Sequence, residues 1–217
     1  MPGVRRAVTT LPPLSLYVHL PWCVRKCPYC DFNSHEAATV IPEAQYADAL
    51  IADLEATLPA IWGRRVQTVF FGGGTPSLMT GKSVDRILQK IAALWPMAND
   101  PEITLEANPA SADTARFADY RAAGINRLSL GVQALNDADL KMLGRLHDVA
   151  EAKAALNLAM KNFPRVSLDL IYARPDQSMA QWRNELKQAL SFGTDHLSLY
   201  QLTIEPQTPF SLLHQTG

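Results

Sequence analysis

The chain has 217 residues, of which 47% are hydrophobic and 19% charged, and its formal net charge is −1. These values indicate one globular domain of ordinary size, and a charge so near zero gives no electrostatic basis for binding nucleic acid or an anionic membrane surface. The N-terminal segment lacks the apolar core of an export signal, and no stretch approaches the roughly 18 apolar residues of a membrane span, so we expect a cytoplasmic protein.

The N-terminal part of the chain leads into a group of cysteines. Residues 1–13 show no regular apolar pattern, and we expect them to form a flexible tail ahead of one core domain over residues 14–217. The apolar run at 14–20 predicts a first strand. All three cysteines of the protein, Cys23, Cys27 and Cys30, follow that strand with the spacing C-x3-C-x2-C.

Strands and helices are predicted to alternate along the rest of the chain. Further strands are expected at 66–71, 103–106, 126–133, 166–172 and 196–200. Helices are expected at 42–58, 82–95, 112–123, 137–143, 149–161 and 179–190, and none after the last strand. A repeat of roughly 30 residues is the size of one βα unit, so the pattern predicts a parallel sheet with helices packed outside it. A full eight-unit barrel would need about 250 residues, more than this chain has.

Unusual polar and glycine residues gather where these predicted strands end. The cysteines follow the first strand and the run Gly72-Gly73-Gly74-Thr75 follows the second. Glu106 closes the third strand, Gln133 closes the fourth, and Asp169 lies in the second half of the fifth. Since the functional site of a parallel barrel lies at the C-terminal ends of its strands, we expect these residues to converge.

The cysteines predict a site for a soft metal. Thiolate ligands select iron–sulfur, zinc or copper(I) centres, and an iron–sulfur cube normally takes four cysteines, so three would leave one iron open. A structural zinc site completed by His19 or His35 also fits the spacing, as do three separate buried thiols. Disulfides are disfavoured by the odd number of cysteines and the lack of a secretion signal.

These motifs resemble a known family. The spacing C-x3-C-x2-C, with Tyr29 before the third cysteine, resembles the radical S-adenosylmethionine (SAM) enzymes. The flanks Tyr17-Val-His-Leu-Pro-Trp-Cys23 and Cys27-Pro-Tyr-Cys30-Asp-Phe-Asn-Ser-His35 resemble its oxygen-independent coproporphyrinogen dehydrogenase branch, and within that branch the heme chaperones of the HemW type. The resemblance spans residues 14–210 and implies an α/β partial (β/α)6 barrel, here without the family's C-terminal domain.

The resemblance also implies cofactors and their ligands. It implies a [4Fe–4S] cluster on the three cysteines, and SAM held by Tyr17, Tyr29, Gly73, Gly74, Thr75, Glu106, Gln133, Arg145 and Asp169. Without it, Glu106 and Asp169 would be expected to form structural ion pairs with Arg127, Arg145 or Arg165, and the glycine run would fit a plain turn equally well. We expect that Gly74→Val obstructs SAM but spares the cluster, since it touches no cysteine.

One departure from the branch bears on function. Phe32 stands where the dehydrogenases carry a further cysteine, which favours a heme chaperone over oxidative decarboxylation of coproporphyrinogen III. The implied partners are heme or a related tetrapyrrole, a heme-acceptor protein and an electron donor such as flavodoxin. The dehydrogenase and a non-catalytic zinc-binding module remain alternatives, and no catalytic residue is assigned. His147 and His196 are candidate heme ligands, although isolated histidines are more often simply hydrogen-bonded.

Overall fold

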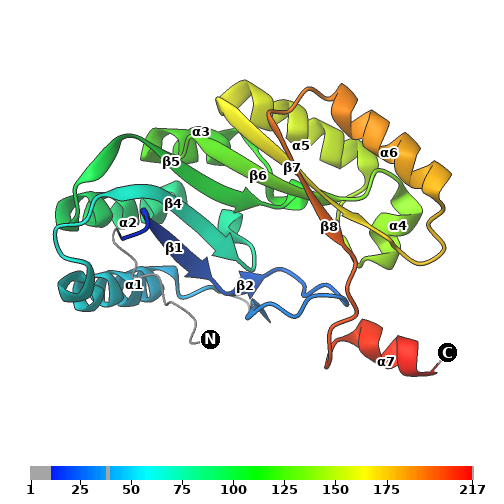
Figure 1. Ribbon diagram of the computed structural model, residues 1–217, viewed down its shortest axis with the longest axis horizontal. Coiled ribbons are helices and arrows are strands. Elements are labelled where there is room, and N and C mark those ends of the chain that lie inside the picture. Colours follow the sequence, from blue (N-terminus) through cyan, green and yellow to red (C-terminus); the bar gives the residue numbers. More distant parts are fainter. Residues whose placement is uncertain (1–10, 38–39, 217) are drawn as a thin grey trace, which may run out of the picture.

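The computed structural model describes residues 11–37 and 40–216 and contains a six-stranded parallel sheet (Figure 1). Its strands lie in the order β1-β4-β5-β6-β7-β8, so each pairs with the one that precedes it in the sheet along the chain. Their bounds are β1 Leu14–Leu20, β4 Val66–Gly73, β5 Met97–Ala107, β6 Arg127–Gln133, β7 Arg165–Tyr172 and β8 His196–Gln201. The predicted parallel sheet and partial barrel are confirmed.

Helices follow the strands and pack along the outer side of the sheet (Figure 1). They are α1 Glu43–Thr57, α2 Gly81–Leu94, α3 Thr114–Ala123, α4 Asp137–Met142, α5 Val149–Asn162 and α6 Met179–Ser191. Helix α2 shows why they pack: Val84, Ile87, Leu88 and Ile91 recur on one face of the helix and are all buried. Burying each such side chain contributes roughly 1.5–3 kcal/mol to folding. No helix of the described residues is long and apolar enough to cross a membrane.

Five of the helices begin directly after a residue whose side chain caps the helix N-terminus. Thr80, Asp113, Asn136, Asp148 and Ser178 each accept a hydrogen bond from a backbone N–H in the first turn of the helix that follows. Such a cap stabilises a helix by about 0.5–2 kcal/mol relative to alanine. These caps set the βα loops, and with them the edge of the sheet that carries the site.

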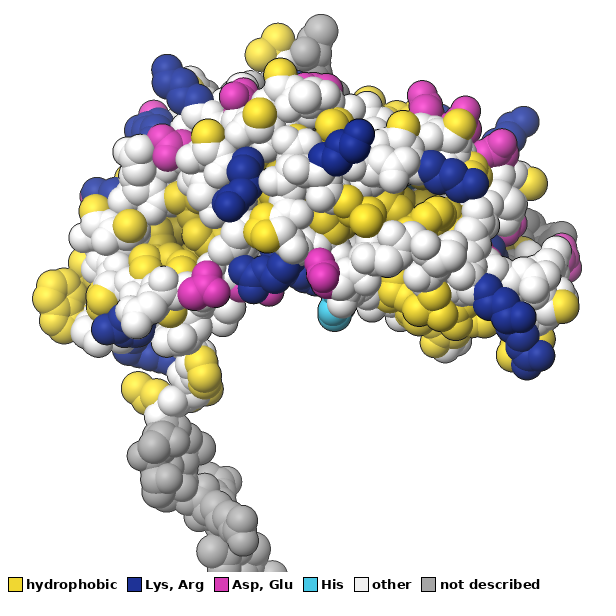
Figure 2. All heavy atoms as spheres, turned by 90° about the horizontal axis from the view of Figure 1, so that it is seen from above, with side chains coloured by type: hydrophobic (Ala, Val, Ile, Leu, Met, Phe, Trp, Pro, Cys, Tyr) yellow, Lys and Arg dark blue, Asp and Glu magenta, His cyan; other side chains and the backbone are white. Residues whose placement is uncertain are grey.

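The two faces of the sheet differ in polarity because successive side chains on a strand point to opposite sides. The helix-facing side carries buried apolar residues such as Leu128, Leu130 and Leu168. The inner side carries polar residues at matching register, with Ser129 beside Ser167. Seen from above, the molecule has an arched outline, with basic and acidic side chains interspersed over the visible surface (Figure 2). The polar residues of the inner face continue to the C-terminal ends of the strands, where the candidate site lies.

Several elements differ from the sequence-based expectation. A helix, α7 Pro209–Thr216, follows the last strand, so the prediction of none there was wrong. Its signal was Thr208-Pro209: the Thr208 hydroxyl accepts from the backbone N–H of Ser211, and proline suits a first helical turn. Two short strands, β2 Trp22–Cys23 and β3 His35–Glu36, pair beside the cysteines. Short 3₁₀ turns lie at η1 Leu58–Ile61, η2 Pro76–Leu78 and η3 Pro109–Ser111. Most of the predicted tail, residues 1–10, lies outside the described residues.

Candidate functional site

The C-terminal ends of β4 to β8 and the cysteine loop surround one cavity of about 460 Å³. All three cysteines line this cavity. Of the nine residues proposed to contact SAM, eight line it as well: Tyr29, Gly73, Gly74, Thr75, Glu106, Gln133, Arg145 and Asp169. Residues that lie far apart in the sequence thus meet at one end of the barrel, as expected for a parallel sheet.

Tyr17 is the predicted contact that does not line the cavity. Its side chain is 58% exposed and stacks on Phe70, with ring centroids 6.1 Å apart and ring planes 18° apart. Its hydroxyl lies 3.3 Å from Nδ1 of His19. The structure therefore places Tyr17 on the open inner face, next to the cavity rather than in its wall.

The cysteine loop is held in shape by its own backbone. The N–H of Cys30 donates to the carbonyl of Cys27 over 3.1 Å, and the carbonyl of Cys23 accepts from Ala37 over 2.8 Å. Lys26 links the two ends of the loop, because its ammonium donates to the carbonyls of Phe32 and Ser34 over 3.0 Å each. These contacts within the loop hold the three cysteines at the wall of one cavity.

The donor set fits an iron–sulfur cluster better than a single ion. All three cysteines are free and half-buried, and burial raises the pKa of the Cys23 thiol. Among the described residues no three His, Cys, Asp or Glu side chains converge closely enough to hold one metal ion. His19, one of the candidate zinc ligands, instead has Nε2 at 2.8 Å from the carbonyl of Asn33. A cluster spreads its thiolate ligands over separate irons, which suits three thiols arranged around a wide cavity.

The glycines at the end of β4 are needed because neighbouring parts of the protein leave no room for a side chain. A Cβ at Gly74 would lie 2.6 Å from the carbonyl oxygen of Trp22, and one at Gly73 would lie 2.8 Å from the His19 ring. The N–H groups of Gly74 and Thr75 donate to the carbonyls of Leu20 and Trp22, both over 2.7 Å. Gly74→Val would therefore push on the residue next to Cys23. Because the end of β4 packs directly on the cysteine loop, we expect this substitution to disturb the cluster as well as SAM, in place of the sequence-based expectation that it spares the cluster.

Glu106 is a carboxylate without a strong counter-charge. Its Oε2 accepts from the N–H of Gly73 over 3.2 Å. Burial, and then the charge of nearby Asp169, raise its pKa from the ordinary 4.5 to about 7, against the opposing effect of that hydrogen bond. Glu106 thus changes charge near neutral pH, and a cationic ligand in the cavity would favour its ionised form.

Asp169 is held by hydroxyl groups. Its two carboxylate oxygens share the hydroxyl donor of Ser129, at 3.1 and 2.9 Å, and one of them also accepts from the Ser167 hydroxyl at 3.1 Å. Burial raises its pKa, and the serine hydrogen bonds oppose that rise. The alternative of structural ion pairs for Glu106 and Asp169 is not what the described residues show, because Arg127 and Arg165 pair with Glu102 instead.

Gln133 enters the cavity from a strained backbone. Its φ is 73°, where a non-glycine residue is uncommon, and the register of β6 on β7 shifts between Gly131 and Gln133. Arg174 supports this corner from below: its guanidinium bonds Glu185 at 2.7 Å and the carbonyl of Ile171 at 2.6 Å. A backbone conformation of this kind persists where the surrounding structure holds it in place.

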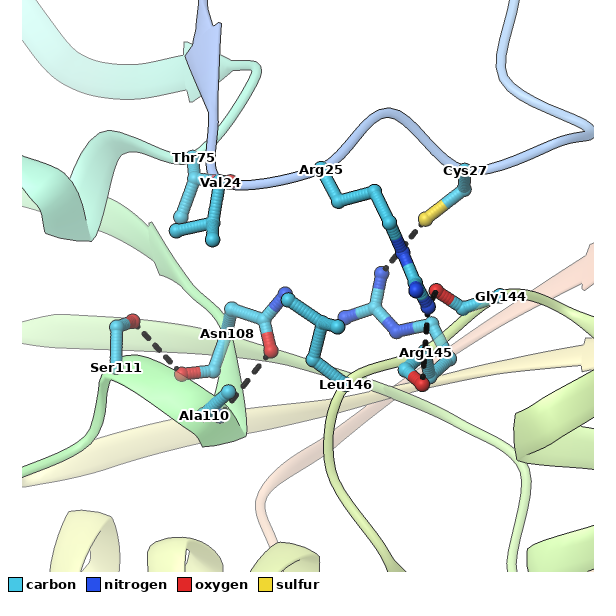
Figure 3. Close-up of a pocket in the computed structure, with 10 residues that line it drawn as sticks. All are labelled: Val24, Arg25, Cys27, Thr75, Asn108, Ala110, Ser111, Gly144, Arg145 and Leu146. Atoms are coloured by element: carbon cyan, nitrogen blue, oxygen red, sulfur yellow. Dashed lines mark hydrogen bonds between the residues drawn. The ribbon is translucent and has the colours of Figure 1, made fainter. Parts of the chain in front are cut away.

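Arg145 reaches the cavity between α4 and α5. One guanidinium N–H donates to Sγ of Cys27 over 3.4 Å, and another donates to the carbonyl of Gly131 over 2.9 Å. Beside it a smaller chamber of about 190 Å³ opens off the main cavity (Figure 3). Tyr29, which lines the main cavity, is half-buried and lies against Phe210, with ring centroids 6.2 Å apart.

Sequence reasoning missed several residues of the site. Ser129 and Ser167, which hold Asp169, share one register position on neighbouring strands. Their signal was a polar residue at alternate positions of otherwise apolar strands. Arg25 and Asn108 also line the cavity, and only the fold brings them there.

The two histidines considered as heme ligands lie elsewhere. His147 is buried with Nε2 at 3.1 Å from the carbonyl of Val132, and burial lowers its pKa to about 4. His196 is exposed at the first position of β8, at the end of the strand away from the site. Neither lines the cavity.

Comparison with known sequences identifies relatives of the chain. The sequence model of the Radical SAM superfamily matches residues 17–189. The heme chaperone HemW of Escherichia coli (strain K12) is 48% identical over 204 residues, which cover 92% of this chain and 53% of that protein. The mitochondrial radical S-adenosyl methionine domain-containing protein 1 of Bos taurus is 42% identical, over 100% of this chain and 47% of that protein.

A solved structure shows the same architecture. Coproporphyrinogen III oxidase (HemN) from Escherichia coli, a radical SAM enzyme, superposes with a TM-score of 0.79 at 30% identity, covering 94% of this chain and 51% of that one. The chain therefore spans about half the length of the curated relatives and of the solved structure that it matches.

Proposed function

This chain belongs to the radical SAM superfamily, and on that premise we propose that its protein is a heme chaperone, which binds heme and transfers it to an acceptor protein. The superfamily binds a [4Fe–4S] cluster and SAM. The observation that carries the proposal is the convergence of three free thiols and eight predicted SAM contacts on one cavity. The likeness to the HemW heme chaperones supports the choice of cargo.

The residues of the cavity have separable tasks. Cys23, Cys27 and Cys30 would each hold one iron of the cluster, which leaves the fourth iron to SAM. When both are bound, the cluster supplies the electron that reduces SAM. Glu106 and Asp169 would face the positive groups of SAM, its ammonium and its sulfonium, because they are the acidic side chains at the strand ends that line the cavity.

The serines and glycines prepare this arrangement. Ser129 and Ser167 fix the orientation of the Asp169 carboxylate, so that little is lost in ordering it on binding. Gly73 orients Glu106 through its N–H. The planar amide of Gln133 offers both a donor and an acceptor to a ligand.

A coproporphyrinogen dehydrogenase is the second candidate, favoured by the structural likeness to coproporphyrinogen III oxidase. Phe32 supports the chaperone instead. It lines the cavity with its side chain 61% exposed, where the resemblance puts a cysteine in the dehydrogenases. An apolar ring at this wall can contact a tetrapyrrole but cannot serve as a thiol.

The proposal extends to partners and location. An electron donor such as flavodoxin would reduce the cluster, and an apo-acceptor protein would receive heme. Three free cysteines suit a reducing cytoplasm, where disulfides are rare.

The test compares two activities of the protein. Heme transfer to an apo-acceptor and conversion of coproporphyrinogen III to protoporphyrinogen IX are measured on the same anaerobic preparation. We expect heme transfer without decarboxylation. Robust decarboxylation would replace the chaperone by the dehydrogenase, and Phe32→Cys alone should not create that activity.

A further inference from the structure

Two arginines from distant parts of the chain interlock at the edge of the cavity (Figure 3). Arg25 lies in the cysteine loop, and its guanidinium donates to the carbonyl of Gly144 and, over 3.5 Å, to that of Arg145. Arg145 in turn contacts the cysteine loop, because its Nη1 donates to Sγ of Cys27 over 3.4 Å. We call this reciprocal pair of contacts the Arg25–Arg145 clasp. Each segment holds the other in place.

The backbone around the clasp is built for close approach. Gly144 has a φ of 72°, and a Cβ there would lie 2.6 Å from Cδ of Pro28, so the segment packs directly on the cysteine loop. The second arm of Arg145 donates to the carbonyl of Gly131 over 2.9 Å. The guanidinium is thus fixed at two points, and one N–H is aimed at the sulfur of Cys27.

The surroundings leave the positive charge acting on that sulfur. The residues that line the chamber shown in Figure 3 include both arginines, and the others, Cys27 among them, are neutral or apolar: Val24, Thr75, Asn108, Ala110, Ser111, Gly144 and Leu146. In the part of the chain that the structure describes, Nε of Arg145 is buried and has no hydrogen-bond partner. A charged donor beside a thiolate makes a stronger hydrogen bond than a neutral one.

From this geometry we propose that Arg145 is a positioning residue for the cluster, which acts through Cys27, and that Arg25 acts through Arg145. The proposal rests on the proposed function only in requiring that the cluster binds. When a one-electron donor reduces the cluster, the added negative charge falls partly on its sulfur ligands. Hydrogen bonds to those sulfurs set the reduction potential, so the clasp stabilises the reduced form and raises the potential. This role differs from the SAM contact that the resemblance implies for Arg145.

The experiment is a potentiometric titration of the anaerobically reconstituted chain with dithionite, without SAM and without heme. Arg145→Met removes both donor and charge, and we expect the ratio of reduced to oxidised cluster at fixed potential to fall at least tenfold, about 59 mV for one electron. Arg145→Gln keeps a donor and Arg145→Lys keeps the charge, so both should give intermediate shifts. Arg25→Met should give a smaller shift in the same direction. Arg183→Gln, at an exposed position of α6, is the matched control and should give none.

A second measurement, SAM affinity at fixed cluster content, separates the two roles of Arg145. An unchanged potential with SAM affinity lowered more than tenfold in Arg145→Met would overturn the proposal and make Arg145 a SAM contact. If Arg145→Met does not retain the cluster, Arg25→Met decides, and an unchanged potential in that variant contradicts the clasp. Since neither SAM nor heme is present in the titration, failure of heme transfer would leave this result standing.

Discussion

The inner face of the barrel carries two groups of charged residues at successive levels along the strands, and the two groups differ in whether their carboxylates form ion pairs. Glu102, in the middle of β5, pairs with Arg127 and Arg165, the first residues of β6 and β7, at 3.8 and 3.4 Å. At the ends of the strands, Glu106 and Asp169 face the cavity with hydroxyl and amide donors but form no ion pair within the described residues. In the lower group the carboxylate of Glu102 is fully compensated by arginines, whereas the two carboxylates of the upper group have no ion-pair partner among the described residues and can use a positively charged ligand.

The difference shows how stability and function are separated on one sheet. A buried carboxylate without a counter-charge costs free energy, and the pKa of Glu106, raised to about 7, records that cost. The protein carries this cost at Glu106, where the proposed ligand would bind, and avoids it at Glu102, four residues earlier on the same strand. Four predictions test the comparison.

The largest effect is expected where the upper layer meets the cysteine loop. Gly74→Val should abolish cluster binding, because its side chain would collide with the backbone of Trp22 beside Cys23. Iron content after anaerobic reconstitution measures this. Gly63→Ala is a control at a turn, where a Cβ meets no atom within 4 Å and only the backbone strain of a φ of 74° is introduced. A Gly74→Val protein with full iron content would show that the end of β4 does not position the loop.

Next in size is the effect of neutralising the upper carboxylates. Glu106→Gln and Asp169→Asn should each weaken SAM binding by about 10–100-fold, since a hydrogen bond to a charged group contributes roughly 1.5–3 kcal/mol. Calorimetric titration with SAM at pH 8 measures it. If both variants bind SAM as the parent does, these carboxylates do not contact the ligand.

A smaller effect is expected from the lower layer. Glu102→Gln should lower the free energy of unfolding by up to about 1 kcal/mol, because its ion pairs are partly exposed and screened by solvent. SAM affinity should be unchanged. Urea unfolding beside the same SAM titration checks both, and a loss of SAM affinity would mean that the two layers are not independent.

Glu106 should also make the stability of the fold depend on pH. Its pKa is raised in the folded protein, so the folded state binds the proton more tightly than the unfolded one. The stabilisation is therefore present below the ordinary pKa of 4.5 and is lost as pH rises towards 7. Glu106→Gln should remove this part of the slope in unfolding measured from pH 5 to 8, and so gain stability relative to the parent at pH 8. A parallel slope in parent and variant would contradict the raised pKa.

Much of the fold could be predicted because it depends on local patterns. The apolar runs predict the strands of the sheet, and the helical spacing of Val84, Ile87 and Ile91 predicts a helix packed against it. The helix α7 was missed because it has only eight residues and its first turn depends on the hydroxyl of Thr208. Local pattern also located the strand ends, and with them most of the cavity wall.

The parts of the site that escaped prediction depend on contacts between distant segments. Arg25 and Arg145 are 120 residues apart in the sequence, and the residues flanking each of them do not predict the contact. Gly74 was interpreted as room for a ligand, but its neighbour is the carbonyl of Trp22 on another strand. Tyr17 was placed with the cavity by resemblance, whereas its ring lies on Phe70. Whether Tyr17 contacts SAM stays a prediction.

The central claim is that three thiols of this chain hold an iron–sulfur cluster with one iron open to SAM. It is tested most directly by the metal content and visible absorption of the anaerobically reconstituted chain, alongside Cys23→Ala, Cys27→Ala and Cys30→Ala. We predict about four irons per chain, with an iron-dependent visible absorption that each substitution abolishes, since the chain has no spare cysteine. Stoichiometric zinc without iron-dependent absorption would contradict the claim.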